Sequence, residues 1–300
     1  MSKVYGYVTE KVLGMLAEGT VPWKKMWQGG AGSFPVSVHG RRYRGINVFM
    51  LSIVGQMKGY TSPVWLTYKQ AVALGGKVTP GEKGTMVTFW KQLQVDDPDK
   101  PGKKKTIPFL RYYTVFNTEQ TEGCTFPKGI AALLVPADPA DDFDPIAEAE
   151  LIFESMPNRP SVAYDGGDRA YYVPALDSVH LPKRESFHSP AAFYDTAFHE
   201  LGHATGHESR LNRRTGDENL GFGSHDYGRE ELVAEMTSAF LCATAGIEQE
   251  TLTNAAAYIN SWMKTIKEDE KMVVWAAGKA QAAADHILGV TPEYTKKETN

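Results

Sequence analysis

Cysteine is scarce in this chain of 300 residues, which contains only Cys124 and Cys242. The two lie far apart in the sequence and match neither a zinc-binding nor a redox spacing. A disulfide framework is therefore excluded as the source of stability, and we expect a reducing compartment, the cytoplasm.

Long apolar runs are missing as well. No segment approaches the roughly 20 apolar residues that a transmembrane helix needs, and the N-terminal stretch has no apolar core of the signal-peptide kind. We therefore expect no membrane partner. Neither a helix-turn-helix nor a zinc-finger spacing appears, which argues against sequence-specific reading of duplex DNA.

The charge that is present is divided unevenly along the chain. Residues 1–130 carry 18 lysine and arginine residues against 8 aspartate and glutamate residues, a net charge of +10. The rest of the chain carries 14 basic and 28 acidic residues, a net charge of −14. This division indicates a basic part with a polyanionic partner, joined to an acidic part.

Length and patterning predict two domains of the α+β class. A chain of 300 residues corresponds to two domains of about 100–200 residues each. Prolines, alanines and aspartates gather over 127–145, so we predict a small domain over 1–130, a linker over 131–145 and a second domain over 146–290. Helices are expected at 4–17, 48–57, 69–74, 146–156, 191–203, 229–245, 255–267 and 269–287, and strands within 78–90, 109–116 and 162–181, with 96–105 as a solvated hairpin tip.

The second domain contains His199-Glu200-Leu201-Gly202-His203, which has the H-E-x-x-H form. Residues 191–198 contain no proline or glycine and suit a helix, on which His199 and His203 lie one turn apart on the same face. Two neutral imidazoles at that spacing can hold one Zn²⁺, with Mn²⁺ or another divalent ion as the alternative. Glu200 then lies beside the metal, where its carboxylate can act as the catalytic general base.

A third ligand is expected on a second helix. Residues 229–236 open a strong helical pattern in which Glu231 and Glu235 lie one turn apart. We predict Glu231 as the third ligand and Glu235 as the carboxylate that hydrogen-bonds a ligand histidine. The reverse assignment stays open, and Glu230 is a further alternative. His207 comes too early for the third histidine of a metzincin, and we interpret it as a supporting residue or an alternative ligand. The order of the motifs, H-E-x-x-H followed by paired glutamates on a second helix, is that of gluzincin-type metallopeptidases.

The basic domain combines flat and cationic side chains in two short stretches. Single-stranded nucleic acid is bound by cations that follow the phosphates and by rings that stack on unpaired bases. The alternative is that the aromatic residues form the core of a small domain and the arginines a solvated face. The candidate DNA contacts are Trp23, Lys24, Lys25, Trp27, Arg41, Arg42, Tyr43, Arg44, Asn47 and Lys83.

The two halves together resemble the ArdC-type antirestriction proteins of conjugative plasmids. The matching segments of the first half are 21–27, 43–47, 65–71 and 81–84, and those of the second are 199–207, 227–235 and 258–262. The resemblance implies an N-terminal single-stranded-DNA-binding domain, shared with plasmid TraC-type primases, and a C-terminal metallopeptidase domain. It also implies metal ligation by His199, His203 and a glutamate of the second helix, with Glu200 as the general acid and base.

We therefore hypothesise an antirestriction protein with a gluzincin-like zinc site, which protects incoming plasmid DNA from host restriction. Its expected partners are single-stranded DNA and an unknown protein substrate. Two alternatives remain: a non-proteolytic DNA-binding shield with a structural metal, and a DNA-dependent protease that clears proteins from DNA.

Overall fold

A computed structural model describes residues 3–23, 34–98, 100, 102–134, 144–213, 225–247 and 255–291. Helices and strands are mixed without regular alternation over this part of the chain, and the predicted α+β class with two domains is confirmed. Residues 135–143 of the predicted linker lie outside the described residues, so the domain boundary stays a prediction.

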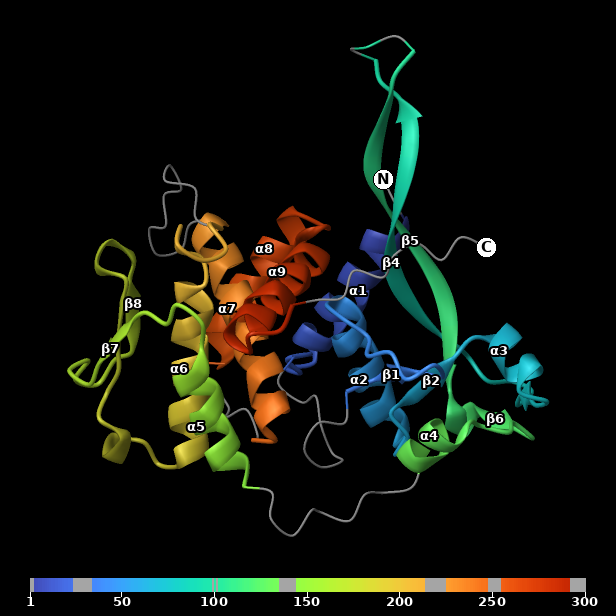
Figure 1. The fold of residues 1–300 in the computed structure, drawn as a ribbon, viewed down its shortest axis with the longest axis horizontal. Coiled ribbons are helices and arrows are strands. Elements are labelled where there is room, and N and C mark those ends of the chain that lie inside the picture. Colours follow the sequence, from blue (N-terminus) through green and yellow to red (C-terminus); the bar gives the residue numbers. More distant parts are fainter. Residues whose placement is uncertain are drawn as a thin grey trace.

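The N-terminal part is built on a four-stranded sheet with the strand order β1–β2–β5–β4 (Figure 1). Its strands are β1 (Val36–Ser37), β2 (Val64–Leu66), β4 (Thr85–Asp96) and β5 (Lys104–Asn117), and a second small sheet pairs β3 (Lys77–Val78) with β6 (Thr121–Glu122). The helices of this part are α1 (Lys3–Ala17), α2 (Ile46–Lys58), α3 (Tyr68–Ala73) and α4 (Lys128–Ala131). Short 3-10 turns follow at Thr118–Gln120 and Ala132–Leu134.

Strands β4 and β5 form a long antiparallel hairpin that projects from the body of the molecule (Figure 1). They are paired without interruption from Thr85↔Val115 to Asp96↔Lys104. Both strands extend beyond the predicted ranges. The added residues, 91–96 and 104–108, lie in the projecting arm, where the side chains that the structure describes bury little apolar surface, which weakens the sequence signal for a strand. The inner half of the hairpin is covered on both faces: Val87 and Val115 pack with Leu51 and Trp65, and Leu110 is buried in the main core.

The C-terminal part is mainly helical, with a small sheet beside the first long helix. It contains α5 (Pro145–Ser155), α6 (Pro190–Ala204), α7 (His225–Ala245), α8 (Ala255–Glu268) and α9 (Met272–Ile287). The sheet has the order β7–β9–β8, formed by β7 (Ser161–Ala163), β8 (Tyr171–Val173) and β9 (Ser178–His180), with 3-10 turns at Pro174–Leu176 and Arg184–Ser186. Helix α7 packs against α6 on one side and α9 on the other.

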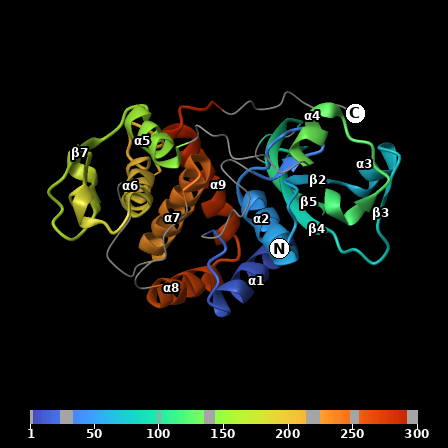
Figure 2. The same cartoon turned by 90° about the horizontal axis from the view of Figure 1, so that it is seen from below.

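One hydrophobic core joins the two parts. Helix α1 packs against α8 and α9, and α2 contacts α9, as the two perpendicular views show (Figures 1 and 2). Trp23 and Trp262 meet edge to face with ring centroids 5.1 Å apart. The predicted helices are present in the structure with boundaries shifted by up to four residues. No helix of the described residues has the length and apolar character to cross a membrane.

Candidate metal centre

Helix α6 carries the H-E-x-x-H segment and has strong local start signals. The Ser189 hydroxyl accepts a hydrogen bond from the Ala192 backbone N–H at 3.0 Å, and Pro190 occupies the first helical position. Both features favour a helix that begins here. The helical repeat then places His199 and His203 on one face, with their Nε2 atoms 3.1 Å apart.

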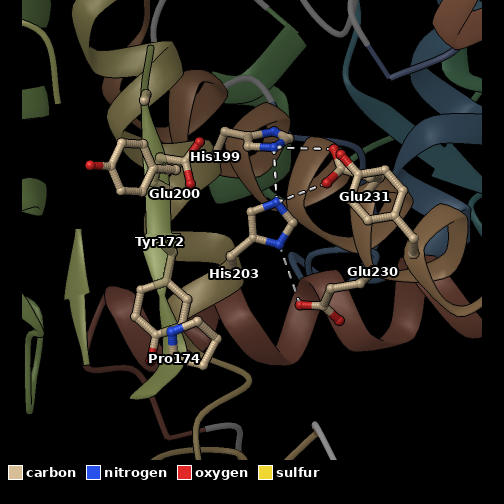
Figure 3. A pocket seen from close by; sticks show the side chains of 10 residues that line it. Tyr172, Pro174, His199, Glu200, His203, Glu230 and Glu231 are labelled. Atoms are coloured by element: carbon tan, nitrogen blue, oxygen red, sulfur yellow. Dashed lines mark hydrogen bonds and ion pairs between the residues drawn. The ribbon is translucent and has the colours of Figure 1, made fainter. Parts of the chain in front are cut away.

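Helix α7 crosses α6 closely at Gly202 and brings Glu231 to the two imidazoles. A Cβ atom at Gly202 would lie only 3.1 Å from the Ala234 Cα, so no larger residue fits without a shift of the helices. At this crossing a Glu231 oxygen lies 3.5 Å from His199 Nε2, and the other lies 3.3 Å from His203 Nε2. The structure thus brings together the three residues that the sequence predicted as ligands (Figure 3).

The separations are of the size expected for side chains that would hold one divalent cation between them. For metal–ligand distances of about 2.0–2.2 Å, two ligand atoms lie about 3.3–3.5 Å apart. The two Nε2 atoms lie 3.1 Å apart, and each faces a different oxygen of Glu231, at 3.5 Å from His199 and 3.3 Å from His203, so the three side chains converge within reach of one ion. His199, His203 and Glu231 would hold such an ion with three protein side chains, the number that is usual for catalytic rather than structural zinc sites.

Two further carboxylates lie at the Nδ1 atoms of the histidines. Glu235 lies 3.5 Å from His199 Nδ1, and Glu230 lies 3.6 Å from His203 Nδ1. A carboxylate at Nδ1 fixes the tautomer that leaves the Nε2 lone pair free for a metal. The geometry thus supports Glu231 as the ligand and Glu235 as the residue that orients His199.

The acidic surroundings favour positive charge between the helices. Burial lowers the pKa of His199, but the nearby carboxylates, Glu231 and Glu235 foremost, outweigh this effect and raise the pKa to about 10. Burial raises the pKa of Glu231, but the two histidines reverse that effect and hold the pKa well below its ordinary value. The field that retains protons on the imidazoles equally favours a cation in their place.

Arg213 fixes the carboxylate of Glu230, which lies next to His203. Its guanidinium donates two hydrogen bonds to Glu230, at 2.6 and 3.0 Å, and is almost fully buried. It also donates to the Thr205 hydroxyl and the Gly202 carbonyl at the end of α6. Burial raises the pKa of Glu230, but His203 and Arg213 outweigh it and lower the pKa to about 2. Sequence reasoning missed Arg213, because a single arginine in a connecting segment has no pattern.

Glu200 lies beside the metal-ligand cluster in a cavity of about 390 Å³. Its side chain is buried, and in Figure 3 Glu200 and Glu231 flank the imidazoles from opposite sides. The cavity is also lined by the segment that contains β8, at Ala170, Tyr171, Tyr172 and Pro174, and by Tyr227 of α7. A buried carboxylate, the three clustered side chains His199, His203 and Glu231, and room for a substrate thus meet at one place.

His207 is not part of the cluster formed by the three predicted ligands. Its Nδ1 lies 2.8 Å from the Ser209 hydroxyl oxygen and 4.0 Å from the Asp177 carboxylate. The same carboxylate pairs with Arg210, which donates to the Ala204 carbonyl at the end of α6. The interpretation of His207 as a supporting residue is the one that these contacts favour.

The predicted DNA contacts are spread over several environments. Trp23 is corrected to a core residue, because it is only 1% exposed and packs on Trp262, which leaves no ring face for a base. Asn47 is likewise structural: its amide donates to the Thr88 carbonyl and accepts from the Thr88 N–H, both at 2.7 Å. Arg44 forms an ion pair with the buried Asp285 of α9.

The remaining candidates differ in exposure. Arg41, Arg42 and Lys83 are exposed, and Tyr43 is half-buried. Lys24, Lys25 and Trp27 lie outside the described residues. The exposed aromatic residues of the hairpin, Phe89, Trp90, Phe109, Tyr112 and Tyr113, were not among the candidates, although the sequence shows their clustering.

Comparison with known proteins agrees with this arrangement. Residues 148–279 match the family of zincin-like metallopeptidases, and residues 2–116 match the N-terminal domain of the anti-restriction factor ArdC. Two crystal structures of the antirestriction protein ArdC from plasmid R388 are similar to this chain. The metal-free structure has a TM-score of 0.75 and 34% identity over 97% of this chain and 100% of that one. The Mn(II)-bound structure has a TM-score of 0.74 and 35% identity over 95% and 97%.

Curated relatives give the same result. The chain is 34% identical to the uncharacterized protein y4eC of Sinorhizobium fredii, over 94% of this chain and 90% of that protein. It is 36% identical to two DNA primases TraC of Escherichia coli over 97% and 94% of its length, but spans only 28% and 19% of the primases. Fold and site thus define a zincin-like metallopeptidase domain behind a smaller α+β domain. The chain belongs to the ArdC family of antirestriction proteins.

Proposed function

We propose that this protein is a metal-dependent peptidase that binds single-stranded DNA and protects incoming plasmid DNA from restriction. The observation that carries the enzymatic half is the three-ligand cluster of His199, His203 and Glu231, open on one side to a cavity. The ion would be zinc, or manganese as in the Mn(II)-bound relative. We further propose that it works in the cytoplasm, where incoming DNA is attacked.

In peptide hydrolysis, the metal ion and the protein side chains would have separate roles. When bound, a divalent cation supplies Lewis acidity, which polarises a carbonyl and acidifies a water molecule. Glu200 lines the cavity beside the cluster, so its carboxylate can take the proton of the attacking water and pass it to the leaving amine. Glu235 and Glu230 hold the imidazoles through their Nδ1 atoms.

The substrate would be an extended peptide segment. Strand β8 stands at the end of the sheet order β7–β9–β8, so one of its edges has no strand partner within the described sheet. The segment around β8 also lines the cavity. An extended peptide can add to such an edge through backbone hydrogen bonds, which presents a scissile bond to the site.

Glu200→Gln tests the peptidase proposal. The variant keeps the shape of the side chain but loses the basic carboxylate, so we expect cleavage of unfolded casein by the zinc- or manganese-loaded protein to fall at least about 100-fold. Zinc binding, measured by calorimetry, should persist. Cleavage at the wild-type rate by metal-loaded Glu200→Gln would refute the mechanism.

The DNA half of the proposal is supported by charge and by relatives. Residues 1–130 have a net charge of +10, and the relatives include DNA primases. Cations that neutralise phosphates make binding fall with salt, so affinity for an oligonucleotide should drop steeply between 50 and 200 mM salt. Arg41 and Arg42 are the arginines to substitute in a DNA-binding test, because loss of Arg44 would also break its ion pair with Asp285 of α9.

Antirestriction separates the main proposal from its alternatives. Transfer of unmodified plasmid DNA into a restricting recipient should lose protection when Glu200→Ala replaces the wild-type protein. Full protection by a folded Glu200→Ala variant would instead favour a DNA-binding shield. Casein cleavage that occurs only when single-stranded DNA is added would favour a protease that clears proteins from DNA.

A further inference from the structure

The β4–β5 hairpin exposes an ordered array of rings and cations below its projecting arm. Directly paired residues of antiparallel strands point to the same face. The pairs Val87↔Tyr113, Phe89↔Arg111 and Lys91↔Phe109 therefore follow one another on one face. We define the ring–cation face as Phe89, Lys91, Phe109, Arg111 and Tyr113.

The side chains of this face contact one another but remain open to solvent. The Phe89 and Tyr113 ring centroids lie 5.6 Å apart, and the Arg111 guanidinium lies 5.7 Å from the Phe109 centroid. The three rings are 39%, 38% and 42% exposed for Phe89, Tyr113 and Phe109 respectively. Lys91 and Arg111 are exposed as well. Exposed apolar surface gathered in this way indicates a binding surface.

The composition of the hairpin favours a polyanionic ligand that carries flat groups. Residues 85–95 and 104–117 contain no aspartate or glutamate, and the whole hairpin, 85–117, has 6 basic against 3 acidic residues. Lysine and arginine side chains that alternate with aromatic rings suit a nucleic-acid strand, because the cations bind its phosphates and the rings stack on its bases. Duplex DNA hides its base faces in the stack, whereas a single strand presents them.

At Tyr113, the ring–cation face adjoins the basic stretch 41–44 that the sequence analysis singled out. Tyr43 is half-buried, and its hydroxyl hydrogen-bonds the Tyr113 hydroxyl. The exposed Arg41 and Arg42 therefore belong to the chain segment that leads to the inner end of the ring–cation face. Arg41 and Arg42 can therefore bind the phosphates of a nucleic-acid strand that continues past the hairpin.

We propose that single-stranded DNA binds along the ring–cation face of the hairpin, with bases stacked on Phe89, Phe109 and Tyr113 and phosphates held by Lys91 and Arg111. This inference rests on the proposed DNA-binding function and places that function on the hairpin, in place of the buried Trp23. The other face of the same hairpin, with Trp90 and Tyr112, provides a matched control, because its rings are 56% and 51% exposed.

The test compares two double variants of the full chain. Binding of a fluorescein-labelled thirty-nucleotide oligo(dT) is followed by fluorescence anisotropy, with a duplex and oligo(rU) of the same length as comparisons. Each lost stacking ring should weaken binding about 5-fold or more. We therefore expect Phe89→Ala/Phe109→Ala to weaken binding at least about 20-fold, and Trp90→Ala/Tyr112→Ala to change it less than about 3-fold.

The cations of the face give an independent readout. Each phosphate contact with a single strand contributes about 0.7 to the slope of log affinity against log salt. Lys91→Ala/Arg111→Ala should therefore reduce the magnitude of that slope by about 1.4. An unchanged slope would overturn the assignment of phosphates to these two side chains.

The outcomes separate this inference from the proposed function. A wild-type protein that binds no single-stranded DNA refutes both. Wild-type binding that Phe89→Ala/Phe109→Ala leaves intact, or that only the Trp90/Tyr112 variant loses, refutes the hairpin assignment alone. A change of oligomeric state in light scattering, with DNA binding unchanged, would instead assign the face to a second copy of the chain.

Crosslinking covers the case in which a variant does not fold. A bromodeoxyuridine-substituted oligonucleotide is irradiated with the wild-type protein, and the adducts are mapped by mass spectrometry. Adducts on Phe89, Phe109 or Tyr113 support the inference. Adducts confined to other segments overturn it.

Discussion

His203 is held by acidic groups at both of its ring nitrogens. Its Nε2 faces Glu231 at 3.3 Å, and its Nδ1 faces Glu230 at 3.6 Å. Glu230 is itself fixed by two hydrogen bonds from Arg213. Residues that contact a metal ligand without binding the metal orient that ligand, and their loss commonly weakens metal binding about 10–100-fold.

Arg213→Ala should weaken zinc or manganese binding by about 10-fold or more, because Glu230 loses the partner that fixes it against His203. Calorimetric titration of the metal-free protein measures the change. Arg159→Ala is the matched control, since Arg159 pairs with Glu154 at 2.8 Å in another part of the molecule. Equal metal affinity in wild type and Arg213→Ala would show that the pair has no part in ligand orientation.

At the scale of elements, the site depends on how closely α6 and α7 cross. Gly202 lies at the crossing, where a Cβ would approach the Ala234 carbonyl oxygen to 3.3 Å and the Thr237 Cβ to 3.3 Å. A backbone neighbour cannot turn aside as a flexible side chain can. Any larger residue must therefore move the helix that carries Glu231 relative to the helix that carries the histidines.

Gly202→Ala should destabilise the fold by about 1–3 kcal/mol through overpacking and should also weaken metal binding. Urea unfolding and calorimetry measure the two effects. Gly278→Ala, on the exposed side of α9 with no atom within 4 Å of the new Cβ, should instead stabilise by about 0.5–1 kcal/mol. Unchanged stability and metal affinity in Gly202→Ala would contradict the close-crossing argument.

A second link at this scale fastens the end of α6 to the small sheet. The Asp177 carboxylate accepts from the Tyr172 hydroxyl at 2.7 Å and pairs with the Arg210 guanidinium, whose side chain is 1% exposed. Burial raises the pKa of Asp177, but Arg210 and Tyr172 outweigh it and hold the pKa below its ordinary value. A carboxyl with a lowered folded-state pKa stabilises the protein above its unfolded pKa, and this stability is lost as pH falls through the folded pKa.

Asp177→Asn should therefore cost about 2–3 kcal/mol at pH 7, and the difference from wild type should shrink below about pH 4. Urea midpoints at pH 7, 5 and 3 test the sign. Glu122→Gln, whose ion pair with Lys77 at 3.1 Å is exposed on both sides, should change stability by less than about 1 kcal/mol. A wild-type advantage that grows on acidification would be the opposite of the expected dependence.

At the scale of the whole molecule, the two parts are fastened through their helices. Besides the Trp23–Trp262 contact, the Thr9 hydroxyl donates to the Glu270 carbonyl at 2.7 Å, and the Gly45 N–H donates to the Gln281 side chain at 3.0 Å. Core residues of α1, α2, α7 and α9 belong to one cluster. We expect the two parts to unfold together.

Trp23→Ala should lower stability by about 3–5 kcal/mol and should loosen both parts at once. Hydrogen exchange followed separately in α2 and α7 tests this, because protection should fall in both helices. Trp90→Ala removes an equally large but exposed ring from the hairpin and should have little effect. Loss of protection confined to α2 would show that the two parts are independent.

The sequence was informative where a function follows from spacing along one helix. The separation of four between His199 and His203 is sufficient to place both imidazoles on one face. It was less informative where similar side chains differ only in their neighbours. Trp23 is in the core and Phe89 is in solvent, yet both are aromatic residues near lysines, and only packing between distant segments distinguishes them.

The amino-acid sequence by itself determined all the longer helices, the paired histidines and the division of charge, because each depends on residues close together in the chain or on composition. Tertiary structure alone decided which of three glutamates faces which imidazole nitrogen, and which rings remain open to a ligand. Those outcomes depend on the crossing of α6 and α7 and on the length of the β4–β5 hairpin. Contacts of that kind join residues far apart in sequence, where no local periodicity specifies them.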